Sequence, residues 1–339
     1  MKTKSLRGIL RLLALAGLAV SSLALAQQAP ERGIVHVGGD LYRAQNNAHF
    51  TVFLVTSEGI IVSDPINRDF AEWLKGELES RYDVPVRILL YSHHHWDHAS
   101  GGEVFDDTAE LVGHETMPAA LALRSPDTPL SGAAADLDAN GNGRIEQAEA
   151  NGNLAGQFAL IDADGDGALT GAEIARGPLS DVHPPSTVYS GSRTVTLGGK
   201  SVELIHIASD HSPDMSVLRF PDEDAVFFVD IISVKRLPFQ TFPGLEVDGL
   251  IETIQSVEAL DFSVAVGGHG DIGTKQDVTD HRRYIEELRD AVAAGMADGQ
   301  SLEELQASIT MDAYSDWASF NWLADNIAGM YRMLGGGNN

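Results

Sequence analysis

The segment Tyr91–Gly102, YSHHHWDHASGG, follows the apolar run VRILL and carries four histidines and one aspartate within six residues. A short apolar run of this kind is typical of a buried strand. In an extended segment, residues two apart point to the same side, so His93 and His95 can reach one point in space. Asp97 and His98 follow where the chain turns and can reach a second point nearby. Imidazole and carboxylate are the ligands that zinc takes when thiolate is absent, so the segment predicts a metal site at a strand end.

Three further apolar strands also end in a residue that can bind metal. VELIHIAS runs into Asp210 and His211, AVFFV runs into Asp230, and FSVAVGG runs into His269. Sites built at strand ends on a rigid sheet are a common arrangement in proteins. The ordered series of four such strands predicts that their terminal side chains converge.

These motifs, HHHWDH, SDHSPDM, FFVD and GGHG, resemble those of the metallo-β-lactamase-fold superfamily of hydrolases over roughly residues 34–273, the segment 124–185 excepted. The resemblance implies an α/β fold, a four-layer αβ/βα sandwich, with two zinc ions. It implies three histidines on the first ion, two histidines and an aspartate on the second, and a bridging aspartate. In that order the ligands are His93, His95 and His211, then Asp97, His98 and His269, and finally Asp230.

The resemblance also implies a catalytic role for Asp97, which would bind metal and orient the nucleophile. Thiolate-using lactamases have a cysteine in the region of Asp230, whereas this chain has no cysteine at all. The resemblance therefore shifts toward the glyoxalase-two-like, lactonase-like and cysteine-free lactamase branches.

Several other polar residues near these motifs have two interpretations. Asp64 ends the strand GIIVSD, where the family usually has an aspartate that braces the ligand loop, but a capping role before Pro65 fits equally. His94 is expected to face away from its two neighbours. His206 is expected to pack in the core. His49 opens a strand and could line the cleft, although a solvated histidine is the simpler expectation.

The segment 124–185 has few apolar runs and proline-rich borders, which indicates an insert in the host domain. It contains two matches to the EF-hand calcium loop, DANGNGRIEQAE and DADGDGALTGAE, which start 24 residues apart. This short spacing predicts a compact pair of calcium loops. The second loop has more carboxylates and is expected to bind calcium more tightly. The predicted calcium ligands are Asp138, Asn140, Asn142, Arg144, Glu149, Asp162, Asp164, Asp166, Ala168 and Glu173.

The chain is divided accordingly into a signal peptide at 1–26, a metallo-hydrolase domain at 27–123 and 186–339, and the EF-hand-like insert at 124–185. The leader has a basic start, an apolar stretch too short to span a bilayer, and a small-residue ending ALA. A periplasmic or secreted protein with no stable membrane anchor after cleavage is expected. Removing the four basic residues of the leader leaves 19 basic residues against 49 acidic ones, a formal charge of −30. Such a charge argues against nucleic acid as a partner.

The local patterns also predict elements. Residues 34–64 read as successive strands, 70–81 as a helix, and 280–297 and 320–334 as C-terminal helices, with a capping box at Ser301 and Glu304. Four aromatic residues are candidates for pocket walls, although core positions are the commoner use of such residues. They are Phe239, Phe242, Trp317 and Trp322.

The function expected from these features is that of an exported zinc-dependent hydrolase. A metal-bridging hydroxide would open a small-molecule amide or ester such as a β-lactam or lactone. One alternative is phosphodiester or sulfate-ester hydrolysis on the same site. Another is a calcium-binding interaction module whose metal site is vestigial. The sequence leaves the substrate and the oligomeric state open.

Overall fold

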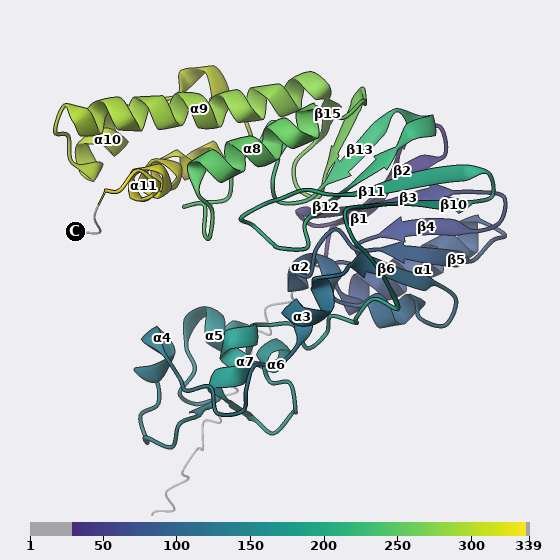
Figure 1. The fold of residues 1–339 in the computed structure, drawn as a ribbon, viewed down its shortest axis with the longest axis horizontal. Coiled ribbons are helices and arrows are strands. Elements are labelled where there is room, and N and C mark those ends of the chain that lie inside the picture. The colour runs from purple at the N-terminus through teal and green to yellow at the C-terminus, as the bar shows by residue number, and fades with distance from the viewer. Residues whose placement is uncertain (1–28, 337–339) are drawn as a thin grey trace, which may run out of the picture. The chain divides into compact units, whose positions relative to one another are not determined.

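The computed structural model describes residues 29–336 of the 339-residue chain, so the expected signal peptide lies outside the described residues. From Glu31 onward the chain forms one compact unit. The unit contains a seven-stranded sheet, a six-stranded sheet and a separate two-stranded ribbon (Figure 1). No helix within residues 29–336 combines the length and the apolar character needed to cross a membrane.

The first sheet has the spatial order β1-β2-β3-β4-β5-β6-β9. Its first four strands pair antiparallel, as the hairpin pattern predicts, and its last four pair parallel. A parallel neighbour requires a crossover connection, which helix α1 (Arg68–Arg81) supplies between β4 and β5. The strands are β1 (Arg32–Gly38), β2 (Leu41–Asn46), β3 (His49–Val55), β4 (Ile60–Ser63), β5 (Val86–Leu90), β6 (Glu110–His114) and β9 (Thr187–Tyr189).

The second sheet has the spatial order β10-β11-β12-β13-β14-β15. It is antiparallel except for β13 and β14, which run parallel and are joined through helix α8 (Val247–Glu258). The strands are β10 (Ser192–Leu197), β11 (Lys200–His206), β12 (Ser216–Phe220), β13 (Ala225–Phe228), β14 (Val264–Gly267) and β15 (Ile272–Thr274).

Three apolar clusters separate four layers, which confirms the predicted αβ/βα sandwich. Successive residues of a strand point to opposite faces. Leu89 therefore packs with α1 while Leu90 packs between the sheets, and Phe227 packs between the sheets while Phe228 faces the C-terminal helices. Each sheet thus buries both of its faces, which explains the continuous apolar runs in its sequence.

Helix α8 and the long helix at 275–297 pack against the outer face of the second sheet, and the last two helices pack together beside the far part of that long helix (Figure 1). The predicted helices are confirmed as α9 (Lys275–Ala297), α10 (Leu302–Ser308), which has the Ser301–Glu304 capping box, and α11 (Leu323–Met333). The sequence analysis did not identify α8. Helical spacing of its apolar residues is the sequence pattern that could have predicted this helix. The residues are Val247, Leu250, Ile251, Ile254 and Val257.

The segment between β6 and β9 has a small apolar core of its own. Ile145 pairs with Leu169 across the β7–β8 ribbon, and both pack against Phe158 and Ile161. Toward its end, Leu179 and Val182 join the core of the first sheet, so the segment is attached to the host by buried apolar contacts. Its elements are α3 (Met117–Leu121), α4 (Gly132–Ala135), β7 (Ile145–Glu146), α5 (Gly152–Gly156), α6 (Phe158–Ile161), β8 (Ala168–Leu169) and α7 (Gly171–Arg176).

Candidate metal centre

The histidine-rich segment leaves β5 in an extended conformation and then forms the short helix α2 (Trp96–Ala99). The buried carboxylate of Asp64, at the end of β4, accepts a hydrogen bond of 2.8 Å from the backbone N–H of Ser92. This contact fixes the chain just before His93. The bracing interpretation of Asp64 therefore has a direct structural basis.

One group of side chains forms where His93 and His95 meet residues from the second sheet. The group contains His93, His95, His211 and Asp230, whose donor atoms all lie within 4.8 Å of one another. The Nε2 atoms of His93 and His211 lie 3.4 Å apart. They lie 3.3 and 3.2 Å from Oδ2 of Asp230, respectively. These are the four residues assigned by resemblance to the first metal and the bridge.

A second group forms on the other side of the same aspartate. The Nε2 atoms of His98 and His269 lie 3.2 Å apart, and 3.4 and 3.1 Å from Oδ1 of Asp230. Asp97 belongs to this group, with its Oδ2 atom 3.7 Å from Nε2 of His98. The two oxygens of Asp230 therefore face different groups, which is the arrangement that a bridging ligand requires. Asp230 has a φ of 62°, a left-handed conformation that non-glycine residues adopt rarely and often at functional sites.

His49 is an unexpected member of the second group. Its Nε2 atom lies 3.5 Å from Oδ2 of Asp97, and its side chain is only half-exposed. A solvated histidine was the simpler expectation because the other candidate ligands follow strands, whereas His49 begins β3. The adjacent backbone offers the explanation for its position: the carbonyl of Ala48 lies 2.8 Å from Nδ1 of His269.

The remaining predicted residues lie outside both groups. His94 turns away from the centre, and its Nδ1 atom lies 2.8 Å from Oδ1 of the buried Asp214. His206 stacks on His114 with ring centroids 4.0 Å apart. Phe242 is buried and Trp317 packs against the C-terminal core, so neither is a free wall residue. Phe239 is 54% exposed and contacts Trp322 edge-on.

The electrostatics of the centre favour a positive charge between the carboxylates. Burial opposes protonation of His98, but Asp230 and Asp97 outweigh it and raise the pKa of His98 to about 9. Burial also opposes ionisation of Asp230, yet the surrounding histidines hold its pKa well below the ordinary value. Burial raises the pKa of Asp64 to about 6. Within residues 29–336, Nδ1 of His98 and Oδ2 of Asp64 are buried without a hydrogen-bond partner.

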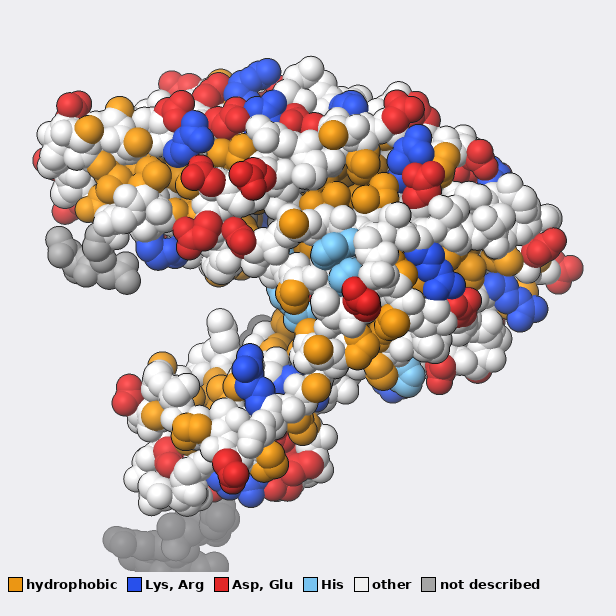
Figure 2. Space-filling view, viewed as in Figure 1, with side chains coloured by type: hydrophobic (Ala, Val, Ile, Leu, Met, Phe, Trp, Pro, Cys, Tyr) orange, Lys and Arg blue, Asp and Glu red, His pale blue; other side chains and the backbone are white. Residues whose placement is uncertain are grey.

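The donor set fits divalent metal ions. It consists of imidazole nitrogens and carboxylate oxygens that point toward one another. Without a metal ion between them, several nitrogen lone pairs or N–H groups would lie close together. Figure 2 shows histidine side chains gathered near the middle of one face. The identity of the metal and of each ligand stays a prediction.

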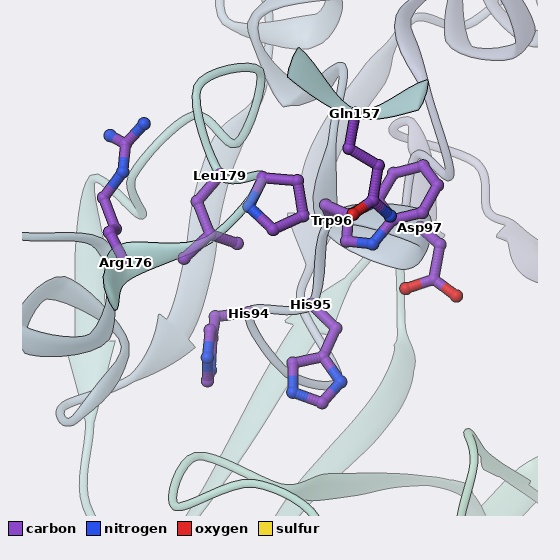
Figure 3. A pocket seen from close by; sticks show the side chains of 8 residues that line it. His94, His95, Trp96, Asp97, Gln157, Arg176 and Leu179 are labelled. Atoms are coloured by element: carbon purple, nitrogen blue, oxygen red, sulfur yellow. The ribbon is translucent and has the colours of Figure 1, made fainter. Parts of the chain in front are cut away.

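A cavity of about 340 Å³ adjoins this centre. His94, His95, Trp96 and Asp97 form one side of it, and residues of the inserted segment form the other. In Figure 3, the side chain of Gln157 extends toward Trp96 and Asp97, and Leu179 faces the two histidines. The insert therefore contributes a wall to the pocket beside the metal centre.

The comparisons with known proteins agree with this architecture. No family model matches the chain. It is 21% identical over 291 residues to the 2,4-dinitroanisole O-demethylase subunit alpha of Nocardioides sp. (strain JS1661), covering 84% of this chain and 69% of that protein. It superposes on the metallo-beta-lactamase from Pontibacter korlensis with a TM-score of 0.53 and 13% identity, over 76% of this chain and 99% of the other. The chain has the metallo-β-lactamase fold.

A second solved structure matches a larger share of this chain. The stereoselective inverting sec-alkylsulfatase Pisa1 from Pseudomonas sp. matches 91% of this chain with a TM-score of 0.58 and 13% identity. The chain spans about half the length of that alkylsulfatase, 51% of it. In this metallo-β-lactamase fold, both metal-ligand groups lie where ends of strands from the two facing sheets meet.

Proposed function

We propose that this protein is a zinc-dependent hydrolase that opens a small-molecule amide or ester such as a β-lactam or lactone. The observation that carries the proposal is the position of Asp230, whose two oxygens face two separate groups of histidine and aspartate. Such an arrangement suits two ions a few ångströms apart. Zinc is the metal that best suits a set of imidazole and carboxylate ligands without thiolate.

His93, His95 and His211 would hold one zinc ion and Asp97, His98 and His269 the other, with Asp230 between them. When bound, two zinc ions supply a water nucleophile with a lowered pKa and stabilise negative charge that develops on the substrate. Burial opposes ionisation of Asp97, but His49 and His98 outweigh it and lower its pKa. Its carboxylate is therefore ionised at neutral pH and can accept a hydrogen bond from the attacking water. His49, 3.5 Å from Oδ2 of Asp97, would position that carboxylate.

Metal analysis and a substrate panel test the proposal. The purified protein should contain about two zinc ions per chain and should lose hydrolysis on chelation. Nitrocefin, a set of lactones, alkyl sulfates and p-nitrophenyl phosphodiesters separate the substrate classes. His95→Ala should abolish the activity, whereas His206→Ala, outside both groups, should retain it. Undiminished turnover in His95→Ala would refute the proposal.

Sulfate-ester or phosphodiester hydrolysis is the second candidate. The likeness to an alkylsulfatase over 91% of the chain favours the sulfate ester of the two. Hydrolysis of alkyl sulfates without hydrolysis of nitrocefin or lactones would favour this candidate over the first.

We also propose calcium binding by the two loops of the insert, with a structural role. Asp162, Asp164 and Glu173 are grouped in the second loop. The carboxylate of Asp162 accepts hydrogen bonds from the N–H groups of Gly165 and Gly167, which have positive φ. Calorimetric titration with calcium tests this, and the absence of heat up to about millimolar calcium would refute it.

Export to the periplasm or the medium fits a calcium-binding insert, because such compartments supply calcium. We therefore propose that the chain is exported and acts on a small-molecule substrate. Fractionation of cells that express the full chain would test this, since retention of the uncleaved chain in the cytoplasm would contradict export.

A further inference from the structure

Arg236 lies in the segment that leads away from the central aspartate. From Ile231 to Val234 the chain is buried, and Val234 forms a parallel bridge with Gly270, next to His269. On its other side the segment is held by Ala318, whose N–H donates to the carbonyl of Lys235 at 2.9 Å. The backbone at Arg236 is thus fixed relative to residues of both metal-ligand groups.

The side chain of Arg236 is unusual for this acidic protein. Its guanidinium carbon lies 4.8 Å from the ring centre of Trp322, a cation–π contact. Within residues 29–336 it has no ion pair within 4.0 Å and no side-chain hydrogen bond, although the chain has 49 acidic residues. The side chain is partly buried, and its nitrogens are not among the fully buried polar atoms without partners, so they keep some contact with solvent. Five N–H donors are therefore available to a ligand.

An apolar surface adjoins this cation. Phe239, 54% exposed, meets Trp322 with ring centroids 5.3 Å apart at 85°. The exposed ring of Phe239 and the partly buried ring of Trp322, beside an unpaired guanidinium, fit a ligand with an apolar body and an anionic group. Arg176, which lines the cavity, is a weaker candidate: it donates to Ser180, and Figure 3 shows its guanidinium pointing away from His94 and His95.

We propose that Arg236, Trp322 and Phe239 form a substrate-binding subsite for amphiphilic organic anions, in which Arg236 binds a carboxylate or sulfate-type group. An alkyl or aryl body would pack on the two aromatic rings. The inference rests on the proposed function. Only divalent cations bound at the centre offset the negative charge of its carboxylates, which without them would repel an anionic ligand. The inference narrows the substrates of that function to negatively charged esters, amides or sulfate esters.

Calorimetric titration of the zinc-loaded protein with three ligands of equal chain length tests the subsite. Hexanesulfonate and hexanoate should bind more tightly than hexanol, and comparing the two anions tells sulfate-type from carboxylate recognition. Arg236→Gln should weaken binding of the preferred anion roughly 10- to 100-fold and leave hexanol unchanged. Lys235→Gln removes the same charge from the exposed neighbouring residue, and it should change neither the binding of the anions nor that of hexanol. Phe239→Ala should weaken all three ligands.

Two results would overturn the subsite. One is equal binding of hexanol and the anions by the wild-type protein. The other is an equal loss in Arg236→Gln and Lys235→Gln, which would indicate general surface charge. If Arg236→Gln fails to fold, Arg236→Lys takes its place and should keep part of the preference for anions.

The failure of the subsite and that of the proposed function can be told apart. A protein that shows the Arg236-dependent preference but hydrolyses nothing retains the subsite and loses the function. A protein that hydrolyses neutral and anionic esters alike, with KM values unaffected by Arg236→Gln, retains the function and loses the subsite.

Discussion

Asp64 shows how one buried carboxylate can serve a centre that it does not enter. It accepts the N–H of Ser92 through one oxygen, and its other oxygen is buried without a partner within residues 29–336. The charge of His98 is the largest effect that favours the ionised form of Asp64. A histidine that binds metal through Nε2 commonly places its Nδ1–H near a carboxylate, which raises the basicity of the ring.

Asp64→Asn should therefore lower zinc affinity about 10- to 100-fold, because the hydrogen bond to Ser92 can persist while the charge is lost. Competition with a chromophoric chelator measures this. The metal-free variant should unfold at the same or a higher temperature than the metal-free wild type, since burial raises the pKa of Asp64 to about 6 and disfavours its ionised form. An unchanged zinc affinity would leave Asp64 with a capping role only.

His281 predicts a pH dependence of stability that does not involve the metal centre. Burial lowers the pKa of this histidine on α9 to about 4, although a hydrogen bond to the backbone of Ser233 acts to raise it. The unfolded chain, with a pKa near 6.5, binds more protons than the folded chain between these values. The stability is thus fully present above pH 6.5 and is lost as pH falls toward 4, by about 3 kcal/mol. Denaturant unfolding of His281→Gln should show a flatter profile over this range, and parallel profiles would contradict the assignment.

The sequence predicts the residues of the centre better than it predicts their surroundings. His93 and His95 are recognisable because strand periodicity decides which way each side chain points, and Asp97 and His98 because they follow directly where the chain turns. The place of His49 in the second group was not predicted, because it depends on a contact between Ala48 and His269. A contact across more than two hundred residues leaves no local pattern in the sequence.

At the scale of elements, the insert places an arginine from one loop onto the ligands of the other. A guanidinium nitrogen of Arg144, in the first loop, forms an ion pair with Asp166 and donates to the carbonyl of Ala168 at 3.0 Å. Both are predicted ligands of the second loop. The expectation of tighter calcium binding at the second loop considered only its carboxylates and omitted this contact.

Arg144→Gln should therefore increase the calcium affinity of the second loop about two- to fivefold, because the cation that occupies its ligands is removed. The backbone carbonyl of residue 144, the predicted ligand in the first loop, remains. Calorimetry with Arg193→Gln as a control for charge elsewhere measures the change. Identical calcium binding in Arg144→Gln and the wild type would show that Arg144 does not compete.

Among the elements, strands and long helices follow from local pattern, but their partners do not. The spacing predicts a helix at 280–297, and α9 begins five residues earlier, at Lys275. Its packing on α8 and α11 depends on Tyr284, which donates to Asn326 at 2.7 Å, while Asn326 donates to the carbonyls of Pro238 and Gln240. These buried polar contacts link three distant segments, and nothing in any one of the segments indicates the other two.

At the scale of the whole molecule, the metal centre connects the two sheets. His93, His95, Asp97 and His98 follow a strand of the first sheet, whereas His211, Asp230 and His269 follow strands of the second. Each group therefore contains ligands from both halves of the sandwich. Metal binding to the folded chain alone should stabilise the whole unit.

Each bound zinc ion should raise the free energy of unfolding of the metal-free protein by about 2.7 kcal/mol when free zinc exceeds its Kd about 100-fold. Thermal unfolding with and without zinc measures this. His211→Ala should lose most of the increase and His206→Ala should keep it. An equal increase in both variants would place the stabilising ions elsewhere.

Because the insert forms one wall of the pocket, mutations that alter the pocket can be distinct from mutations that alter the candidate metal ligands. Gln157 and Leu179 reach the pocket from a segment that leaves and re-enters the first sheet at neighbouring strands, β6 and β9. Mutations in that segment can alter which molecules are admitted while the ligand-bearing strands stay intact. A new substrate selectivity can thus evolve through changes in the insert, while the residues of the candidate metal centre stay the same.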